Sequence, residues 1–376
     1  MKAIQRTLVI GGGFSGMSAA VELRKRGIEV DLVEIDEGWR SYGAGISIGG
    51  ATLRALRTLG VLDAFLARGS AGDLLTLRRR DGQILDHVPT PRLAGADVPG
   101  EGAIMRPVLA EILADATRAA GTRVLLGTSA RSIVQDAEGA EVLLTNGERR
   151  RYELVVAADG LYSKTRSMLM PDAAAPRYSG QSVWRAVLPR HTAVGNATMW
   201  LGMPGTKVGL NPVSSAQMYM FITEDRPARD YLEPDSFVEC MRSLLAPFEC
   251  PVLQAARDGL GEHSQIVFRP LENLLVPQPW HRGRVVLIGD AVHATTPHLA
   301  SGACIGIEDA IVLAEEVERA DSVAQALQRF GARRWERCRM VVENSARLGE
   351  LEMAKEGREE QQQLLRQSMA ALAAPI

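Results

Sequence analysis

Residues 8–16 read Leu-Val-Ile-Gly-Gly-Gly-Phe-Ser-Gly, a short apolar run that breaks at once into glycines. The apolar run is typical of a buried strand, and apolar residues at helical spacing follow from Phe14 to Arg26, where Gly27 ends the pattern. The next strand is expected from Val30 to Val33. Strand, glycine turn, helix and strand in this order predict a βαβ unit.

Each glycine of such a unit has its own task. Gly11 makes the tight turn, Gly13 lets main-chain N–H groups approach a pyrophosphate, and Gly16 lets the helix pack on the strand. The helix N-terminus adds unpaired donors and a partial positive charge. Glu34 closes the second strand, where its carboxylate can accept hydrogen bonds from ribose hydroxyls. The pattern predicts a dinucleotide site and leaves NAD and FAD open.

Two later segments favour FAD. Residues 152–158 predict a buried strand that ends at Asp159-Gly160, before a basic helix start. A strand from Val285 to Ile288 ends at Gly289-Asp290, and after a turn at Pro297 a helix is expected near Gly302. A carboxylate at such a strand end can hold a ribityl hydroxyl, and the helix start can face an anionic reduced ring.

Composition limits the remaining choices. The chain has 376 residues, 46% of them hydrophobic, which is enough for one or two domains with a large core. A net charge of −2 without charge blocks gives no footprint for nucleic acid or a membrane surface. No signal-peptide core or spanning segment is seen, so a cytoplasmic protein with a small-molecule partner is expected. The four cysteines and six histidines show no metal-site spacing, and no metal is predicted.

These motifs together resemble the single-component FAD-dependent aromatic-ring monooxygenases, which include salicylate, hydroxybenzoate and urate hydroxylases. The resemblance spans essentially the whole chain and rests on GGGFSG with Glu34, on Asp159-Gly160, and on residues 289–310, GDAVHATTPHLASGACIGIEDA. Gly43-Ala44-Gly45-Ile46 is similar to the family's loop near the flavin, and Arg106 with Leu109 to its Arg-x-x-Leu helix. The chain departs from the family at Ala300-Ser301-Gly302, where Gly-Gln-Gly is usual, and at Gly49-Gly50, where Pro-Asn is frequent.

The resemblance implies an α/β fold of the p-hydroxybenzoate hydroxylase type, a Rossmann-like FAD-binding domain with an inserted mixed or antiparallel β-sheet substrate domain. It places the FAD-binding domain at residues 1–75, 100–176 and 280–350, the substrate domain at 76–99 and 177–279, and a C-terminal helix or tail at 351–376. It implies cofactor contacts from Gly11, Gly13, Phe14, Ser15, Gly16, Glu34, Ile35, Gly45, Arg106, Asp159, Asp290, Pro297, Gly302 and Ala303.

The activity implied is a cycle of two half-reactions. NADH or NADPH, docking transiently, reduces FAD, and O2 then forms a flavin C4a-hydroperoxide that hydroxylates an aromatic or N-heteroaromatic substrate. The alternative is a flavin-dependent dehydrogenase or reductase of the same fold. A flavin halogenase is disfavoured because the Trp-x-Trp-x-Ile-Pro run is absent, and a non-catalytic flavin-binding protein is disfavoured by the complete set of motifs.

Three residues are candidates for the substrate side. Stretches such as 182–187 and 217–221 alternate in polarity, which predicts antiparallel strands with one face on a core. Lys207 lies in a strand pair that resembles one in urate hydroxylases, where an arginine takes its place and an acid stands at His298, so urate is a doubtful substrate. Lys207 either pairs with an anionic substituent of the substrate or points to water. His298 either takes a proton from the substrate or bonds to backbone, and Tyr219 either orients the substrate or packs in the core.

From about Val323 onward an intermittent apolar stripe predicts a long amphipathic helix that covers the FAD domain. Its arginines, at positions 333, 334, 337 and 339, are expected to form a solvated face. The polar tail from Glu356 to Gln363 is expected to be either a homodimer contact or a frayed end.

Overall fold

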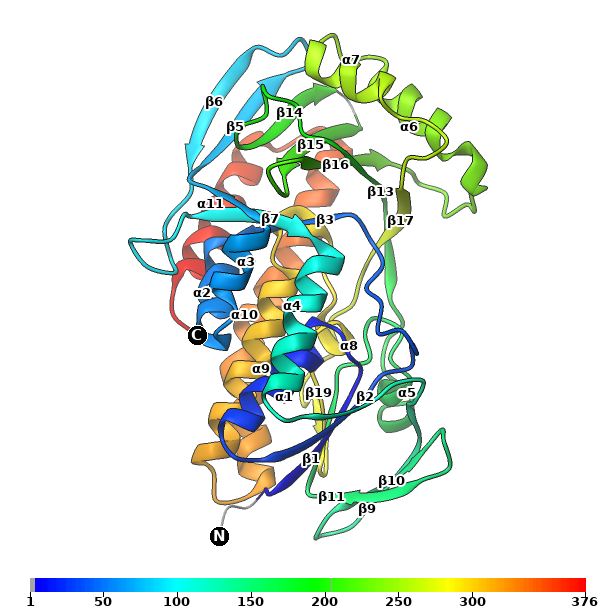
Figure 1. Cartoon of the computed structure of the whole chain (residues 1–376), viewed down its shortest axis with the longest axis vertical. Coiled ribbons are helices and arrows are strands. Elements are labelled where there is room, and N and C mark those ends of the chain that lie inside the picture. Colours follow the sequence, from blue (N-terminus) through cyan, green and yellow to red (C-terminus); the bar gives the residue numbers. More distant parts are fainter. Residues whose placement is uncertain (1–3, 204) are drawn as a thin grey trace.

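A computed structural model describes residues 4–203 and 205–376, and a six-stranded sheet lies in the lower half of the molecule as drawn in Figure 1. The strand order is β18-β19-β12-β1-β2-β8, and all neighbours except β18 and β19 pair in parallel. The strands are β1 (Arg6–Ile10), β2 (Glu29–Val33), β8 (Arg123–Leu125), β12 (Leu154–Ala157), β18 (His281–Arg282) and β19 (Val285–Leu287). With α1 (Phe14–Lys25) between β1 and β2, the predicted βαβ opening is confirmed.

Helices from both ends of the chain pack beside this sheet. Helix α1 contacts α4 and α9, and α9 contacts α10 (Figure 1). The helices of this part are α2 (Gly50–Leu59), α3 (Leu62–Arg68), α4 (Arg106–Ala119), α5 (Lys164–Leu169), α8 (Asp290–His293), the 3-10 turn η2 (Pro297–Leu299), α9 (Gly302–Arg319), α10 (Val323–Ala354) and α11 (Arg358–Ala373). None of the helices described is long and apolar enough to cross a membrane.

A seven-stranded sheet forms the other end of the molecule, in the order β17-β13-β16-β15-β14-β5-β6. The strands are β5 (Leu74–Arg79), β6 (Ile84–Pro89), β13 (Arg177–Pro189), β14 (Ala197–Met203), β15 (Thr206–Pro212), β16 (Gln217–Asp225) and β17 (Ile266–Asn273). Strands β13 and β16 pair antiparallel, as the alternating stretches predicted, whereas β14 and β5 pair in parallel. The sheet is therefore mixed.

The two faces of the large sheet pack against different parts of the molecule. One face carries a core that includes Trp184, Val208 and Met220, and it packs against α6 (Phe237–Leu245) and α7 (Pro251–Asp258) at the end of the molecule (Figure 1). A short 3-10 turn, η1 (Pro234–Ser236), precedes α6. Because side chains alternate along a strand, the neighbours of these core residues lie on the opposite, inner face.

Two three-stranded sheets complete the fold. One is formed by β9 (Ala130–Gln135), β10 (Ala140–Leu144) and β11 (Arg149–Tyr152). The other is formed by β3 (Gly45–Gly49), β7 (Glu101–Met105) and β4 (Ser70–Gly72), and β3 contacts β13 and β16 of the large sheet. The predicted boundary between residues 75 and 76 falls inside β5, so it places most of β5 and all of β6 with the later strands of the large sheet. The domain boundaries remain a prediction.

The long helix near the C-terminus is confirmed as α10, but the expectation that its arginines form a solvated face is wrong for two of them. The Arg334 side chain is 1% exposed, and Arg337 is 11% exposed. Both pair with Glu308, which α9 directs toward α10. Sequence spacing marked these positions as polar, but it did not show that the facing helix supplies buried carboxylates.

The tail is not frayed, because residues 358–373 form α11, which returns along α10. Arg337 donates to the carbonyls of Ala371, Leu372 and Ala374 at the end of α11. Arg54 donates to carbonyls in the same segment. The last turn of α11 is therefore capped by two cations, which satisfies carbonyls that have no partner within the helix.

Candidate functional site

The parallel strands bring the predicted site elements to one edge of the six-stranded sheet. Strands β19, β12, β1 and β2 are consecutive neighbours and run in the same direction, so their carboxyl ends lie together. These ends carry Asp290, Asp159, the glycine turn and Glu34. Ligands of open α/β sheets bind outside this edge.

Two glycines of the turn are required by the protein's own packing. Gly11 has φ +103°, and a Cβ there would collide with the carbonyl oxygen of Ala158, just before Asp159. A Cβ at Gly16 would collide with the carbonyl oxygen of Gly11. Gly13, in contrast, is exposed, and a Cβ there would meet no atom within 4 Å. Gly11 and Gly16 are thus packed tightly against the protein backbone, whereas the turn is open at Gly13, where a bound group can approach.

Helix α1 directs its N-terminus at this open side. Phe14 and Ser15 begin the helix, and no side chain of the described chain caps it. Its first-turn N–H groups are therefore available to an anion. Ser15 also lies so close to Gly289 and Gly306 that a Cβ at either position would collide with its Oγ. This packing fixes the glycine turn against the segment that carries Asp290.

Glu34 is held in place by the backbone on both sides. Its Oε2 accepts a hydrogen bond from the Gly12 N–H at 2.6 Å, and its Oε1 accepts one from the Asp36 N–H at 2.8 Å. Each carboxylate oxygen keeps a second lone pair for a ligand hydroxyl. The Trp39 indole donates to the Gly12 carbonyl at 2.9 Å, and Ile35 beside Glu34 is 65% exposed.

The two aspartates at the strand ends have different surroundings. Both oxygens of Asp159 accept hydrogen bonds within the chain, from the Ser163 hydroxyl at 2.5 Å and from the N–H and hydroxyl of Thr165 at 2.9 Å. Asp159 therefore shapes the turn into α5. Within the described residues, the Asp290 carboxylate accepts no hydrogen bond and forms no ion pair, although it is exposed at the site edge. Of the two, Asp290 is the carboxylate with both oxygens free for a ligand.

Arg106 stands across the site from Asp290. Its guanidinium lies over the Phe14 ring, 4.7 Å from the centroid, and the aliphatic part of its side chain lies next to Gly43. Both residues are exposed to solvent, but protein atoms surround their charged groups and displace part of the water. This desolvation lowers the pKa of Arg106 and raises the pKa of Asp290, and the attraction between the two charges opposes both changes. The two opposite charges are thus close enough to stabilise each other electrostatically across the site.

The inner face of the large sheet closes the site from the other side. Tyr219 on β16 is 5% exposed, and its ring lies so close to Gly45 of β3 that no Cβ would fit there. Its hydroxyl accepts a hydrogen bond from Arg185 Nε at 3.2 Å. Phe221, next on the same face, covers Gly209. An aromatic and cationic surface therefore faces the loop of residues 43–46, called the flavin loop below.

Sequence reasoning missed Arg185. It lies in β13 between Trp184 and Ala186, both buried on the opposite face. The strand's period of two was a signal, since it directs residue 185 away from the core side. Among the described residues, the Arg185 guanidinium has no carboxylate partner.

His298 lies at the turn before α9, as expected, and Lys207 lies close to it because both contact Glu352. The His298 side chain is 2% exposed, with Nδ1 3.0 Å from the Thr296 hydroxyl and Nε2 3.5 Å from Glu352 Oε2. Lys207 Nζ donates to Glu352 Oε1 at 2.7 Å. The idea that Lys207 simply points to water is wrong, because it forms an ion pair with a residue of α10.

His293 belongs to a buried network next to Asp290 in the chain. Its Nε2 is 2.5 Å from Asp309 Oδ2, which also accepts from the Gly289 N–H at 2.9 Å. Arg334 donates to Asp309 Oδ1 at 2.8 Å. The Asp309 charge raises the pKa of His293 although burial acts against it, and despite burial His293 and Arg334 lower the pKa of Asp309 to about 2.

Asp309, His293 and Cys338 are close enough in space to hold a metal ion. Arg334 already supplies a positive charge to Asp309, and its guanidinium lies 3.5 Å from the Cys338 sulfur. We therefore interpret the cluster as an internal ion-pair network that holds the Gly289-Asp290 backbone.

The remaining predicted contacts lie on the segment between β19 and α9. Pro297 is exposed at the start of η2, and Gly302 and Ala303 begin α9 after Ala300, which has φ +48°. No side chain of the described chain caps α9, so its N–H groups are free at an eighteen-residue helix N-terminus.

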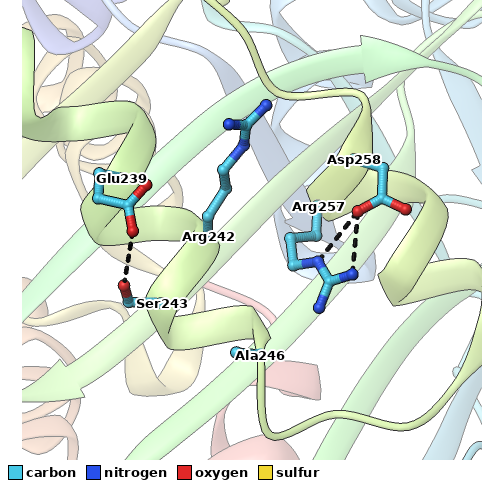
Figure 2. Close-up of a pocket in the computed structure, with 6 residues that line it drawn as sticks. All are labelled: Glu239, Arg242, Ser243, Ala246, Arg257 and Asp258. Atoms are coloured by element: carbon cyan, nitrogen blue, oxygen red, sulfur yellow. Dashed lines mark hydrogen bonds and ion pairs between the residues drawn. The ribbon is translucent and has the colours of Figure 1, made fainter.

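Two surface pockets lie beside the large sheet. One lies between α6 and α7, where Figure 2 shows Arg257 paired with Asp258, and it is on the side of the large sheet away from the site edge. The other, of about 220 Å³, lies between β13, β17, η2 and α10 and has Thr296 and His298 in its wall. The second pocket reaches the His298 ring from the outside.

Comparison with known proteins agrees with this geometry. The model of the family described as FAD binding domain matches residues 5–345. The putative FAD-dependent monooxygenase YetM of Bacillus subtilis (strain 168) is 30% identical over 347 residues, covering 92% of this chain and 93% of that protein. Aurachin C monooxygenase/isomerase of Stigmatella aurantiaca is 31% identical over 363 residues, covering 93% and 90%. The crystal structure of Klebsiella pneumoniae HpxO complexed with FAD and uric acid has a TM-score of 0.83 at 26% identity, covering 99% of this chain and 94% of that one.

Proposed function

The chain belongs to the FAD binding domain family, and from this premise we propose that it is a monooxygenase that uses NAD(P)H and O2 to hydroxylate a small aromatic or N-heteroaromatic molecule. FAD is the cofactor, and the resemblance to aromatic-ring flavoprotein hydroxylases holds. The observation that carries the substrate class is the inner sheet face, where Tyr219, Phe221 and Arg185 face the flavin loop.

The residues at the sheet edge fit FAD. The open glycine turn and the free N-terminus of α1 suit a pyrophosphate, and Glu34 suits a ribose. Asp290 supplies a free carboxylate for a ribityl hydroxyl, and the free N-terminus of α9 suits negative charge on the ring. When bound, FAD supplies the reaction with O2, whereas the protein binds, orients and excludes water.

The substrate side is a proposal built on three side chains. Tyr219 orients the ring through its hydroxyl, and Arg185 attracts an anionic or electron-rich oxygen on the substrate. His298 accepts the proton that the substrate loses as its ring becomes more electron-rich. Lys207, whose ammonium has an internal partner, acts through Glu352 rather than on the substrate directly.

Ligand-stimulated cofactor oxidation tests this function. Phenolic, N-heteroaromatic and purine-like acids are added singly to the FAD-loaded protein with NADH or NADPH under oxygen, and nicotinamide consumption, product and peroxide are measured together. We expect at least one compound to stimulate consumption and to appear as a hydroxylated product. Stimulation that yields only peroxide marks an uncoupled ligand. The proposal fails if every compound leaves the basal rate unchanged.

Asp290→Ala and Asp159→Ala should have opposite consequences. Because Asp290 forms no hydrogen bond and no ion pair within the described chain, its loss should weaken FAD binding at least about tenfold, or ~1.4 kcal/mol, and change the stability of the apoprotein little. Asp159 shapes the turn into α5, so its loss should mainly lower the stability of the apoprotein, by about 1 kcal/mol. Flavin fluorescence titration and urea unfolding of the FAD-free variants measure the two effects. Equal loss of flavin affinity in both variants would contradict this assignment.

Three further properties remain proposals. We propose a cytoplasmic location, where NADH and NADPH are found and where the four free cysteines stay reduced. We propose transient docking of the nicotinamide without a preference for NADH or NADPH, and a homodimer, which sedimentation of the FAD-loaded protein would test.

A further inference from the structure

Glu352 lies between two residues of the proposed substrate side and comes from a distant part of the chain. It is on the last turn of α10, which ends at Ala354. Its Oε1 accepts a hydrogen bond from Lys207 on β15 at 2.7 Å, and its Oε2 lies 3.5 Å from His298 Nε2 on η2. The Glu352 carboxylate of α10 therefore contacts both the large sheet, through Lys207, and the 3-10 turn η2, through His298.

We propose that Glu352 is a positioning residue, which orients the His298 ring and, together with Lys207, sets how readily that ring takes up a proton. The proposal deepens the proposed function, because it gives His298 the role of the site's proton acceptor. It concerns a residue that touches neither cofactor nor substrate.

The His298 ring is constrained from several sides. The Thr296 hydroxyl is 3.0 Å from Nδ1, and the Glu352 carboxylate faces Nε2. Gly349 of α10 lies so close that a Cβ there would be 2.9 Å from His298 Cε1 and 3.0 Å from Gln181 Oε1. A glycine at this helix position lets the ring rest against the α10 backbone, in reach of Glu352 one turn later.

His298 Nε2 is buried and has no hydrogen-bond partner in the described chain. At 3.5 Å from Oε2 it is beyond a normal N–H···O bond, so Glu352 acts on the neutral ring through its charge. A proton taken up at Nε2 would create a charge-assisted bond to this carboxylate. Glu352 is thus in a position to stabilise the protonated His298 ring from within the protein.

The charges around the ring oppose one another. Burial lowers the pKa of His298, Glu352 acts to raise it, and Lys207 acts to lower it further. Although burial favours the neutral acid, Lys207 and His298 lower the pKa of Glu352 to about 2, so it is ionised at working pH. Of the other charged groups nearby, Glu350 of α10 and Arg177 of β13 line the outer pocket and pair loosely with each other at 3.8 Å.

Asp225 of β16 is connected to this region through Gln181. Its Oδ1 accepts a hydrogen bond from the Gln181 amide at 3.1 Å, and the Gln181 side chain approaches Gly349. The chain therefore places Glu352 as the one carboxylate, among the described residues, within ion-pair distance of the His298 ring.

Histidine NMR on the FAD-loaded protein tests the proposal without any substrate. The ring Cε1–H signals of histidine labelled with ¹³C are titrated in the wild type, and His298→Gln identifies the signal of residue 298 among the six histidines. Glu352→Gln should lower the pKa of His298 by about one unit, and Lys207→Met should raise it, because an opposite charge nearby favours the protonated ring and a like charge disfavours it.

Glu350→Gln is the matched control. It removes a carboxylate two residues away on the same helix, near the same pocket, and should leave the His298 titration unchanged. The proposal is overturned if Glu352→Gln leaves the titration in place, or if Glu350→Gln shifts it equally. Glu352→Asp should restore part of the shift, since it returns the charge at a longer distance.

Failure of the proposed function would show elsewhere. If His298→Gln leaves the pH dependence of hydroxylation intact while Glu352→Gln still shifts the NMR titration, the positioning holds and the role of His298 as proton acceptor fails. If the pH dependence of hydroxylation disappears in His298→Gln but Glu352→Gln shifts nothing, His298 keeps its role and Glu352 loses its own.

Discussion

Replacing Gly11 by alanine should leave a folded protein that no longer retains FAD. Gly11 has φ +103°, and a Cβ there would collide with the carbonyl oxygen of Ala158. The glycine turn or the Asp159 segment must shift, and both form the floor of the cofactor site. We expect FAD affinity to fall at least about a hundredfold, ~2.7 kcal/mol, as measured by flavin fluorescence titration of the apoprotein.

Gly147→Ala is the control for backbone strain alone. Gly147 has φ +91°, but a Cβ there would meet no atom within 4 Å, and it lies in the turn between β10 and β11. This variant should suffer the cost of an unfavourable φ, about 1–3 kcal/mol of stability, and still bind FAD normally. If Gly11→Ala binds FAD as well as Gly147→Ala does, the close packing of the glycine turn on residue 158 is not what shapes the site.

Replacing Arg334 by methionine should produce the largest loss of stability. The guanidinium is 1% exposed and bonds to Asp309 at 2.8 Å, to Glu308 at 3.1 Å and to the Ile305 carbonyl at 3.0 Å. Methionine fits the space but leaves two buried carboxylates with one cation fewer. Breaking a buried pair in this way costs about 3–5 kcal/mol, to be measured by urea unfolding of the FAD-free protein.

Arg339→Met is the matched control on the same helix. Arg339 forms ion pairs with Glu336 and Glu343 on the surface of α10, and its side chain is 39% exposed. Because solvent screens these pairs, no measurable loss of stability is expected. Comparable destabilisation in the two variants would show that the buried network is not what anchors α10 to α9.

Much of the fold and of the cofactor site follows from local sequence. Residues 8–34 predicted the first βαβ unit because strand and helix have different periods and each glycine answers a steric demand within a few residues. Asp290 was found for the same reason, since a carboxylate directly after a buried strand lies at the carboxyl edge of the sheet.

Contacts between distant segments were not predictable in this way. Lys207 and Glu352 are 145 positions apart, and the sequence around either residue contains no signal that predicts the contact. Arg334 has the composition of a surface residue, and only the packing of α9 on α10 makes it an interior one. Arg185 was predictable in part. The alternation along β13 indicates which face of the sheet carries its side chain, but it does not indicate that the guanidinium lacks a carboxylate partner among the described residues.

Isotope labelling of the product separates monooxygenation from dehydrogenation. The FAD-loaded protein is supplied with NAD(P)H, a ligand that stimulates its oxidation, and ¹⁸O2 in unlabelled water, and the mass of the product is measured by mass spectrometry. We expect one ¹⁸O atom in each hydroxylated product molecule. A product whose new oxygen comes from water would contradict monooxygenation, and a product that has lost hydrogen and gained no oxygen would identify a flavin-dependent dehydrogenase of the same fold.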